Sequence, residues 1–221
     1  DGVDASIIKS DGNYKYKVIE DIYFEYESEI YEKIHFLREK INIRRDLQKY
    51  SKEITLLEKQ ITIFHAKIIQ NLVEFSTVEL IGFHGQTIYH NGEEKISKQI
   101  GDGSLLSQLI KKDVIYNFRQ NDIKNGGEGA PLTPIFHKLM ANQHKFDLPI
   151  CILNIGGISN ISIIENTTDE IGVSSKDIGP GNCLVDSWMR NNSNEKFDKN
   201  GNLAAKGIVN EIILEQGQEL F

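Results

Sequence analysis

The first third of the chain shows two kinds of hydrophobic patterning. Residues 3–10 and 14–19 alternate loosely between apolar and polar positions, with a polar turn at residues 11–13 between them. This pattern predicts a β-hairpin. Residues 27–73 contain neither Gly nor Pro, and apolar residues recur there at helical spacing: Ile30, Ile34, Leu37, Ile41, Leu56, Ile61, Phe64, Ile68 and Leu72. This spacing predicts two or three amphipathic helices whose charged residues face solvent.

Short apolar runs are separated by polar or helical stretches in the remainder. Apolar runs at residues 78–83, 114–118, 150–154 and 160–164 predict strands, and residues 103–112 predict a helix. Strands and helices that alternate in this way predict an α/β fold.

Composition argues against several classes of protein. The chain has 221 residues, with 25 Lys and Arg against 32 Asp and Glu, so its net charge is -7. Such an acidic chain is a poor candidate for sequence-independent nucleic-acid binding, which needs Lys and Arg to displace counterions. We find no membrane-spanning run and no signal peptide, and expect a cytoplasmic protein. The two cysteines form no disulfide or zinc pattern, and Cys151, inside an apolar run, is expected to be buried.

Four segments rich in Gly and polar residues follow apolar runs, where α/β proteins bind their ligands. His84-Gly85-Gln86-Thr87 offers donors and acceptors suited to sugar hydroxyls, with an ordinary polar turn as the alternative. Residues 126–132 contain three glycines, which permit close approach of the backbone to another group. A long turn is the alternative for this second segment.

The other two segments suit an anion and a catalytic carboxylate. Residues 154–160 place Gly156 and Gly157 between two strands, where backbone N–H groups can face an anion, with a plain hairpin as the alternative. In residues 177–182, Asp177 precedes two glycines, and Asn182 is suited to cap a following helix. A carboxylate held there can act as a general base. An ordinary capping turn is the alternative.

The order of the motifs carries more information than each motif alone. The chain resembles the anhydro-N-acetylmuramic acid kinase family over nearly its whole length, and the resemblance weakens in the helical section from residue 20 to 75. Its opening residues Asp1-Gly2-Val3-Asp4 resemble the end of the family's Gly-Thr-Ser-X-Asp-Gly-Val-Asp loop. The other motifs follow in the family's order: His84–Thr87, Gln99-Ile100-Gly101-Asp102, Phe118-Arg119, 126–132, 154–160 and 179–182.

The resemblance implies the actin-like ATPase fold, which is related to ribonuclease H, with two α/β lobes that close around ATP and the substrate. Residues 1–148 match the first lobe, and residues 149–221 match the beginning of a second, incomplete lobe. By this comparison the sequence is truncated at both ends. We therefore expect the chain alone to be inactive.

The implied reaction uses ATP and Mg²⁺ to phosphorylate 1,6-anhydro-N-acetylmuramic acid while water opens the 1,6-anhydro ring. The product is N-acetylmuramic acid 6-phosphate, and the reaction belongs to peptidoglycan recycling. The partner implied is a small-molecule substrate, with no nucleic acid and no membrane, and a homodimer is left open. The Mg²⁺ ligands are not identified.

The resemblance also assigns residues. Asp177 matches the general base. The ATP side is matched by Asp1, Gly2, Val3, Asp4, Gly156, Gly157, Gly179, Gly181 and Asn182. The sugar side is matched by His84, Gly85, Gln86, Thr87, Gly129 and Ala130. Three positions depart from the family: Ile178 replaces a Thr, Asn117 an Asp, and Glu128 a Gln.

Two other interpretations stay open. The chain could be a non-catalytic remnant of a decaying kinase gene. It could also be a different enzyme of the same superfamily, although the combination of His84–Thr87 with residues 179–182 argues against this.

Overall fold

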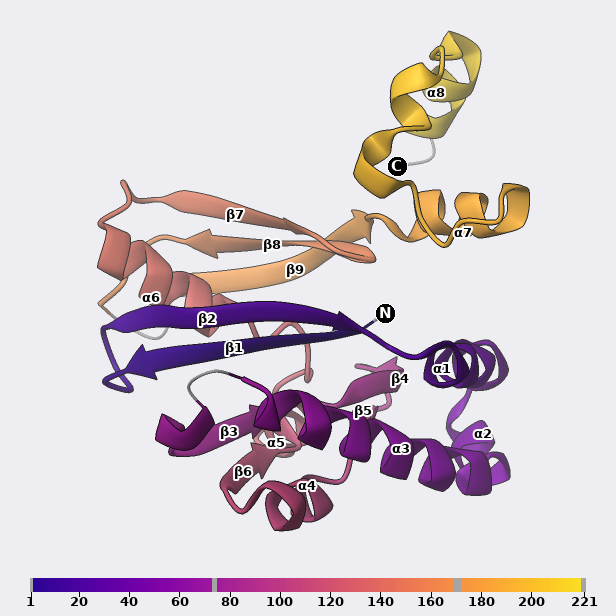
Figure 1. Cartoon of the computed structure of the whole chain (residues 1–221). Helices are drawn as coiled ribbons and strands as arrows, with labels where there is room; N and C mark the ends of the chain where they lie inside the picture. Colours follow the sequence, from indigo (N-terminus) through magenta and orange to yellow (C-terminus); the bar gives the residue numbers. More distant parts are fainter. Residues whose placement is uncertain (1, 73–74, 169–171, 220–221) are drawn as a thin grey trace. The chain divides into compact units, whose positions relative to one another are not determined.

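A computed structural model describes residues 2–72, 75–168 and 172–219. The protein is a mixed α/β chain that divides into two compact units, residues 1–146 and 147–221 (Figure 1). The division lies close to residue 148, where the sequence predicts the lobe boundary. Within the described ranges, no helix has the length and apolar character needed to span a membrane.

The first unit opens with the predicted hairpin, which is confirmed. β1 (Gly2–Ser10) pairs antiparallel with β2 (Tyr16–Glu25). Asp11 fixes the turn, because its carboxylate accepts hydrogen bonds from the N–H groups of Asn13, Tyr14 and Lys15 at 2.9, 2.8 and 3.0 Å. These bonds stabilise the ionised carboxylate and lower the pKa of Asp11 to about 2.

The predicted helical region forms three helices, α1 (Ser28–Lys40), α2 (Arg44–Lys49) and α3 (Ser51–Gln70). The predicted stripe on α1 is confirmed, since its apolar positions are buried. On α3 the prediction is wrong at one position: Leu56 is 68% exposed, whereas Leu57 is 1% exposed. Leu57 is three residues from Ile54 and four from Ile61, so it shares their face, and Leu56 is rotated about 100° away from it.

The remainder of the first unit adds two more strand pairs. β3 (Leu80–Phe83) pairs in parallel with β6 (Asp113–Tyr116), and β4 (Gln86–Asn91) pairs antiparallel with β5 (Ile96–Ile100). The predicted strands and the helix near residues 103–112 are confirmed with shifted ends, while the β4–β5 hairpin has no counterpart in the sequence prediction. The further helical elements are η1 (Phe75–Thr77), α4 (Gly103–Ile110), α5 (Phe118–Lys124) and α6 (Pro134–His144).

The main hydrophobic core of the first unit joins strand β1 to the helices and to the later strands β4 and β5. Val3 of β1 belongs to the same buried cluster as Ile34 of α1, Leu57 of α3, Ile88 of β4 and Ile100 of β5. The hairpin, the helices and the β4–β5 pair are therefore held by one set of apolar contacts, which also places the start of β4.

The second unit is built on a three-stranded antiparallel sheet. β7 (Ile150–Ile155), β8 (Ile158–Ile164) and β9 (Val173–Pro180) are ordered β7-β8-β9, so the predicted β7–β8 hairpin is confirmed. The alternative of an ordinary capping turn at residues 177–182 is wrong for residues 177–180, because these residues end strand β9. The sheet is followed by α7 (Cys183–Asn192), η3 (Lys199–Gly201), η4 (Ala204–Lys206) and α8 (Glu211–Gln218).

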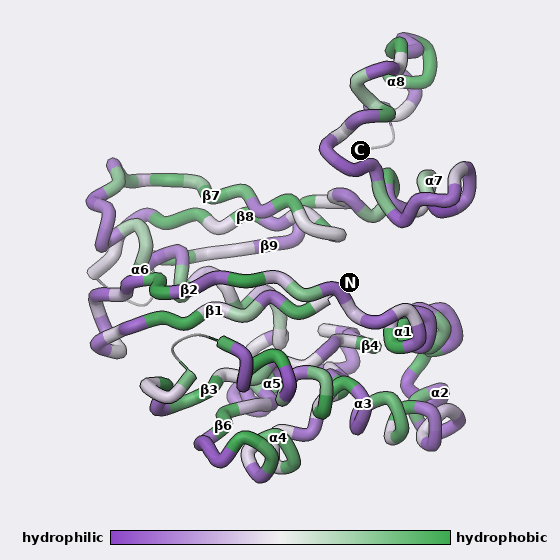
Figure 2. Tube along the Cα trace, in the orientation of Figure 1, coloured by the Kyte–Doolittle hydropathy of each residue, from purple (hydrophilic) through white to green (hydrophobic). Residues whose placement is uncertain are grey.

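The expected burial of Cys151 is also wrong, since the residue is exposed. Successive side chains of a strand point to opposite faces. Cys151 therefore shares a face with Leu153 and Ile155, which are 53% and 57% exposed. Figure 2 shows the hydrophobic residues along β7 and the more polar β9.

We expect Leu57→Ala to lower the free energy of unfolding by about 2–5 kcal/mol, because it removes a buried side chain and leaves a cavity. Leu56→Ala, its neighbour on the exposed face, is expected to change it by less than about 0.5 kcal/mol. Urea unfolding followed by circular dichroism measures both. Equal losses from the two substitutions would contradict the assigned face of α3.

Candidate active site

The His84–Thr87 motif joins two strands. β3 ends at Phe83, His84 and Gly85 form the link, and Gln86 and Thr87 begin β4. Gln86 and Thr87 are half-buried, whereas His84 is exposed. The motif is thus fixed on both sides by strand pairing, and its polar side chains gather where β3 ends.

Arg119 connects this motif with the glycine-rich segment. Its Nε donates to Nε2 of His84 at 2.9 Å, and its Nη1 donates to the carbonyl oxygen of Gly129 at 2.8 Å. Arg119 lies in the first turn of α5, after Asn117 with φ of 61°, a left-handed conformation that Asn tolerates better than most residues. The predicted sugar-side motifs therefore meet through a residue that the sequence analysis noted only within a motif.

The glycine-rich segment packs on α5. Oδ2 of Asp122 accepts a hydrogen bond from the N–H of Gly129 at 2.8 Å. Gly129 has a φ of +79°, and a Cβ there would lie 2.8 Å from the side chain of Ile123. The absence of a side chain at Gly129 therefore lets this segment pack closely against α5. Ala130 follows, half-buried, beside the carbonyl that Arg119 binds.

His84 is held in its neutral form. Because Arg119 donates to Nε2, the ring hydrogen lies on Nδ1, which is 2.9 Å from the carbonyl oxygen of Gly85 and donates to it. Although His84 retains solvent exposure, desolvation by the surrounding protein lowers its pKa below 6.5, and the charge of Arg119 lowers it further, against the effect of the Gly85 carbonyl. With Nε2 occupied, His84 acts here as an acceptor that positions Arg119.

The residues assigned to the ATP loop lie in β1. Gly2, Val3 and Asp4 pair with Glu25, Phe24 and Tyr23 of β2. Val3 is 6% exposed and contributes to the main core, while Asp4 is exposed. Asp1 lies outside the described residues. The start of the chain is thus a strand whose buried side chain anchors it, and its predicted contact with phosphate stays a prediction.

In the second unit, the Gly156–Gly157 turn is bound to the start of α7. The N–H of Gly181 donates to the carbonyl of Gly157 at 2.9 Å, and the N–H of Asn182 donates to that of Gly156 at 2.7 Å. A Cβ on Gly181 would lie 2.2 Å from the Gly156 carbonyl oxygen. Only glycine at position 181 therefore allows this approach.

Asn182 precedes α7 as predicted, but its side chain does not cap the helix. Its Nδ2 donates to the carbonyl oxygen of Ile155 at 3.2 Å, and its φ of -71° and ψ of -14° are helical. An N-cap side chain needs an extended backbone to reach back to the helix N–H groups. Asn182 instead fastens α7 to the end of β7.

Asp177 stands in a row of polar residues that crosses the sheet. It lies opposite Asn160 of β8, which lies opposite Asn154 of β7. Register partners in antiparallel strands share a face and have Cβ atoms about 4.5–5.5 Å apart. Asp177 and Asn154 are exposed and Asn160 is half-buried. The row places an accessible carboxylate beside two amides, near the Gly156–Gly157 turn.

Two local irregularities accompany this row. The β8–β9 register shifts between Ser159 and Asn160, which makes Ile178 the extra residue of a β-bulge. Bulges re-aim side chains and are frequent beside active sites. Among the described residues, the buried Oδ1 of Asn160 has no hydrogen-bond partner. A buried acceptor without a partner lowers the stability of the fold by about 1–3 kcal/mol. Stability alone therefore does not explain why Asn160 is placed there.

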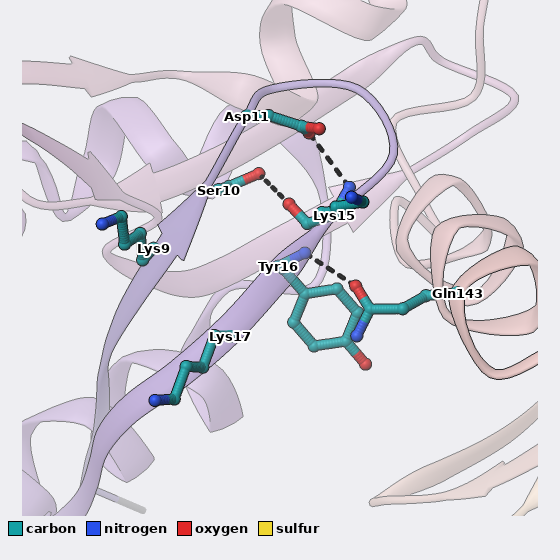
Figure 3. Close-up of a pocket in the computed structure, with 7 residues that line it drawn as sticks. All are labelled: Lys9, Ser10, Asp11, Lys15, Tyr16, Lys17 and Gln143. Atoms are coloured by element: carbon teal, nitrogen blue, oxygen red, sulfur yellow. Dashed lines mark hydrogen bonds between the residues drawn. The ribbon is translucent and has the colours of Figure 1, made fainter.

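A hollow of about 530 Å³ in the first unit lies apart from these motifs. It is at the tip of the β1–β2 hairpin, where the Tyr16 N–H donates to Oε1 of Gln143 at 2.7 Å (Figure 3). Its lining is Lys9, Ser10, Asp11, Lys15, Tyr16, Lys17 and Gln143, which includes none of the motif residues.

Within the part of the chain that the structure describes, no three His, Cys, Asp or Glu side chains gather as a metal cluster.

The state of His84 generates a pH prediction. Its folded pKa is lowered, so the unfolded chain takes up a proton more readily. The stability that the neutral form contributes is fully present above about pH 6.5, the unfolded value, and is lost as pH falls through the lowered folded pKa. NMR titration should give a pKa for His84 below 6.5, and Arg119→Gln should raise it partway. A pKa at or above the ordinary value would contradict the Arg119–His84 bond.

The contact at Gly181 generates a second prediction. Gly181→Ala should destabilise the second unit by more than about 1 kcal/mol, because its Cβ meets a backbone oxygen. Gly157→Ala is the matched control, since no atom lies within 4 Å of its Cβ position. Fluorescence of Trp188, the single tryptophan of the chain, on α7, reports the unfolding. If the two variants have the same free energy of unfolding, the close contact between the turn and the start of α7 is not needed for stability.

Comparison with known proteins agrees with these motifs. The family model for anhydro-N-acetylmuramic acid kinase matches residues 1–219. A protein of Pelagibacter ubique with that name is 54% identical over 100% of this chain and 59% of its own length. One from Gluconobacter oxydans is 35% identical over 98% of the chain and 60% of its length, and one from Agrobacterium fabrum is 36% identical over 95% and 57%. The chain thus spans less than two thirds of these relatives, and it belongs to the anhydro-N-acetylmuramic acid kinase family.

Proposed function

We propose that the chain carries the base and the sugar-binding residues of a kinase that phosphorylates 1,6-anhydro-N-acetylmuramic acid with ATP. The observation that carries this proposal is the exposed carboxylate of Asp177, beside the Gly156–Gly157 turn on one sheet. The relatives that match the chain are named as kinases of this sugar. We place the reaction in peptidoglycan recycling in the cytoplasm, on a two-lobed actin-like fold.

In the proposed reaction, Asp177 accepts a proton from a water molecule. The water oxygen bonds to the anomeric carbon, and the bond from that carbon to the bridging oxygen breaks. The freed oxygen then bonds to the γ-phosphorus of ATP, and the bond from that phosphorus to ADP breaks. Asp177 later releases its proton to solvent. A positioned base of this kind typically contributes about 100- to 10,000-fold to the rate.

The phosphate side is proposed to use the backbone around the Gly156–Gly157 turn. Gly157 has open space at its Cβ position, so a phosphate can approach the backbone. Gly181 and Asn182 already donate their N–H groups to the turn, so they support its shape. Gly179, with a φ of +150°, is the residue before the end of β9, beside the bulge. In the other unit, Gly2, Val3 and Asp4 keep their proposed place at the end of the phosphate loop.

Mg²⁺ would neutralise charge on the ATP phosphates. It prefers oxygen ligands and in kinases commonly takes one or two carboxylates together with phosphate oxygens. The exposed carboxylate of Asp4 fits this preference. A cluster of three acidic side chains is not required for such a site.

The sugar side is proposed to be the surface around His84, Gln86 and Thr87, with Gly85, Gly129 and Ala130 shaping it. Arg119 fixes His84 and Gly129 relative to each other, which pre-organises that surface. The side-chain amide of Gln86 and the hydroxyl of Thr87 match the donors and acceptors of a sugar, while both ring nitrogens of His84 are used in holding Arg119 and the Gly85 carbonyl.

The substrate is tested with an extended protein, made by adding to this chain the segments of the Pelagibacter ubique relative that it does not match. We expect this protein to convert the anhydro sugar and Mg-ATP to the 6-phosphate, and residues 1–221 alone to give no product. Phosphoryl transfer depends on positioning and charge stabilisation, which an incomplete phosphate-binding site cannot supply. Mass spectrometry of the product measures both. Turnover of ordinary hexoses alone would overturn the proposal, and no turnover at all would favour the non-catalytic remnant.

The base is tested in the same extended protein. Asp177→Asn should leave ATP affinity nearly unchanged and lower kcat by about 100- to 10,000-fold, because an amide cannot accept the proton of water. Asp186→Asn, on α7, is the control and should retain turnover. Calorimetry measures ATP binding and a coupled assay measures kcat. The reverse result, with turnover lost only in the second variant, would reassign the base to Asp186.

A further inference from the structure

Gln99 faces Thr87 across the β4–β5 pair. The two residues are register partners, and Nε2 of Gln99 donates to Oγ1 of Thr87 at 3.1 Å. The same Nε2 donates to Oγ of Ser97 at 2.7 Å. Both hydrogens of the Gln99 amide nitrogen are therefore used, and Ser97 prevents the amide from turning away from Thr87.

Thr87 is held on its backbone as well. The Nε of Arg38, on α1, donates to the carbonyl oxygen of Thr87 at 3.3 Å. The strand register then shifts between Thr87 and Tyr89, so that Ile88 is the extra residue of a β-bulge. The backbone and the hydroxyl of Thr87 are thus fixed by different elements at the point where the proposed sugar-binding motif ends.

The direction of the Gln99 hydrogen bond determines what Thr87 can offer. A hydroxyl has one hydrogen to donate and two lone pairs that accept. Gln99 occupies a lone pair. Among the described residues, no acceptor for the hydroxyl hydrogen of Thr87 is found. The hydrogen of this half-buried side chain remains available for a ligand.

We propose that Gln99 is a positioning residue, which holds the Thr87 hydroxyl as a hydrogen-bond donor toward an acceptor oxygen of the sugar. Such oxygens are those of ethers, carbonyls and carboxylates. The proposal rests on the proposed function, because it assumes that Thr87 contacts the anhydro sugar. The proposal also assigns a role to the Gln99-Ile100-Gly101-Asp102 motif, which has none in the proposed catalytic base or phosphate-binding turn.

Gln99→Glu in the extended protein tests this directly. A carboxylate only accepts, so it takes the Thr87 hydrogen and withdraws the donor from the sugar. We expect the Kd of 1,6-anhydro-N-acetylmuramic acid, measured by calorimetry without ATP, to rise about three- to tenfold, the usual range for one hydrogen bond. KM for the sugar should rise equally, with KM for ATP and kcat nearly unchanged. Gln48→Glu, on the exposed face of α2, is the charge-matched control and should bind normally.

A double-mutant cycle separates positioning from simple charge repulsion. Thr87→Val alone should weaken sugar binding as much as Gln99→Glu, and Gln99→Glu should cost nothing more in the Thr87→Val background. Additive losses would overturn the proposal, because they mean that Gln99 acts on the sugar without Thr87. Unchanged sugar affinity in Gln99→Glu would overturn it as well.

A further pair of variants keeps the test decisive if Gln99→Glu fails to fold. Thr87→Ser retains the hydroxyl and should bind the sugar within about twofold of the unmodified protein, whereas Thr87→Val should not. Equal binding by these two variants would overturn the proposal. If the unmodified extended protein neither binds nor converts the anhydro sugar, the proposed function itself fails and the inference with it. Normal conversion with an inert Gln99→Glu exchange would remove only the inference.

Discussion

The hydrogen bonds of Arg119 to His84 and Gly129 are the constraint on which the proposed sugar-side surface depends. They fix the link after β3 and the glycine-rich segment to one side chain at the start of α5. The arrangement works only while His84 is neutral, because a protonated ring has no lone pair for Arg119. Desolvation by the surrounding protein, which lowers the pKa of His84, is therefore part of how the surface is built. The guanidinium of Arg119 thereby holds the His84 link and the glycine-rich segment in one fixed arrangement.

The second unit solves a similar problem with backbone groups. The carbonyls of Gly156 and Gly157 receive the N–H groups that open α7, so the turn and the helix start are one rigid piece. Beside this piece, the row formed by Asn154, Asn160 and Asp177 gives the proposed base, Asp177, polar neighbours across the strands. The bulge at Ile178 lies in the same place. Ile178 places an exposed apolar side chain at this bulge.

Sequence patterns predicted the elements whose apolar residues face one side. The α1 stripe follows from spacing because burial of one face sets the period, and the β1–β2 and β7–β8 hairpins were predicted from apolar runs on either side of a turn. The prediction placed Leu56 on the buried stripe, although Leu57, three residues from Ile54 and four from Ile61, fits the helical spacing of the buried residues. Strand β9 was missed because its sequence, VSSKDIGP, has little apolar alternation and pairs with β8 through its backbone. Arg119 and Gln99 required tertiary contacts, which spacing along the chain does not report.

In the reaction proposed for the extended protein, water attacks the anomeric carbon and the bridging oxygen takes the phosphate. Isotope labelling tests it most directly. The extended protein would be given the anhydro sugar and ATP in water enriched in ¹⁸O, and the product would be reduced at once to block exchange at the anomeric carbon. We expect one ¹⁸O on that carbon and none in the transferred phosphate. Label in the phosphate, or an unlabelled anomeric carbon, would contradict it.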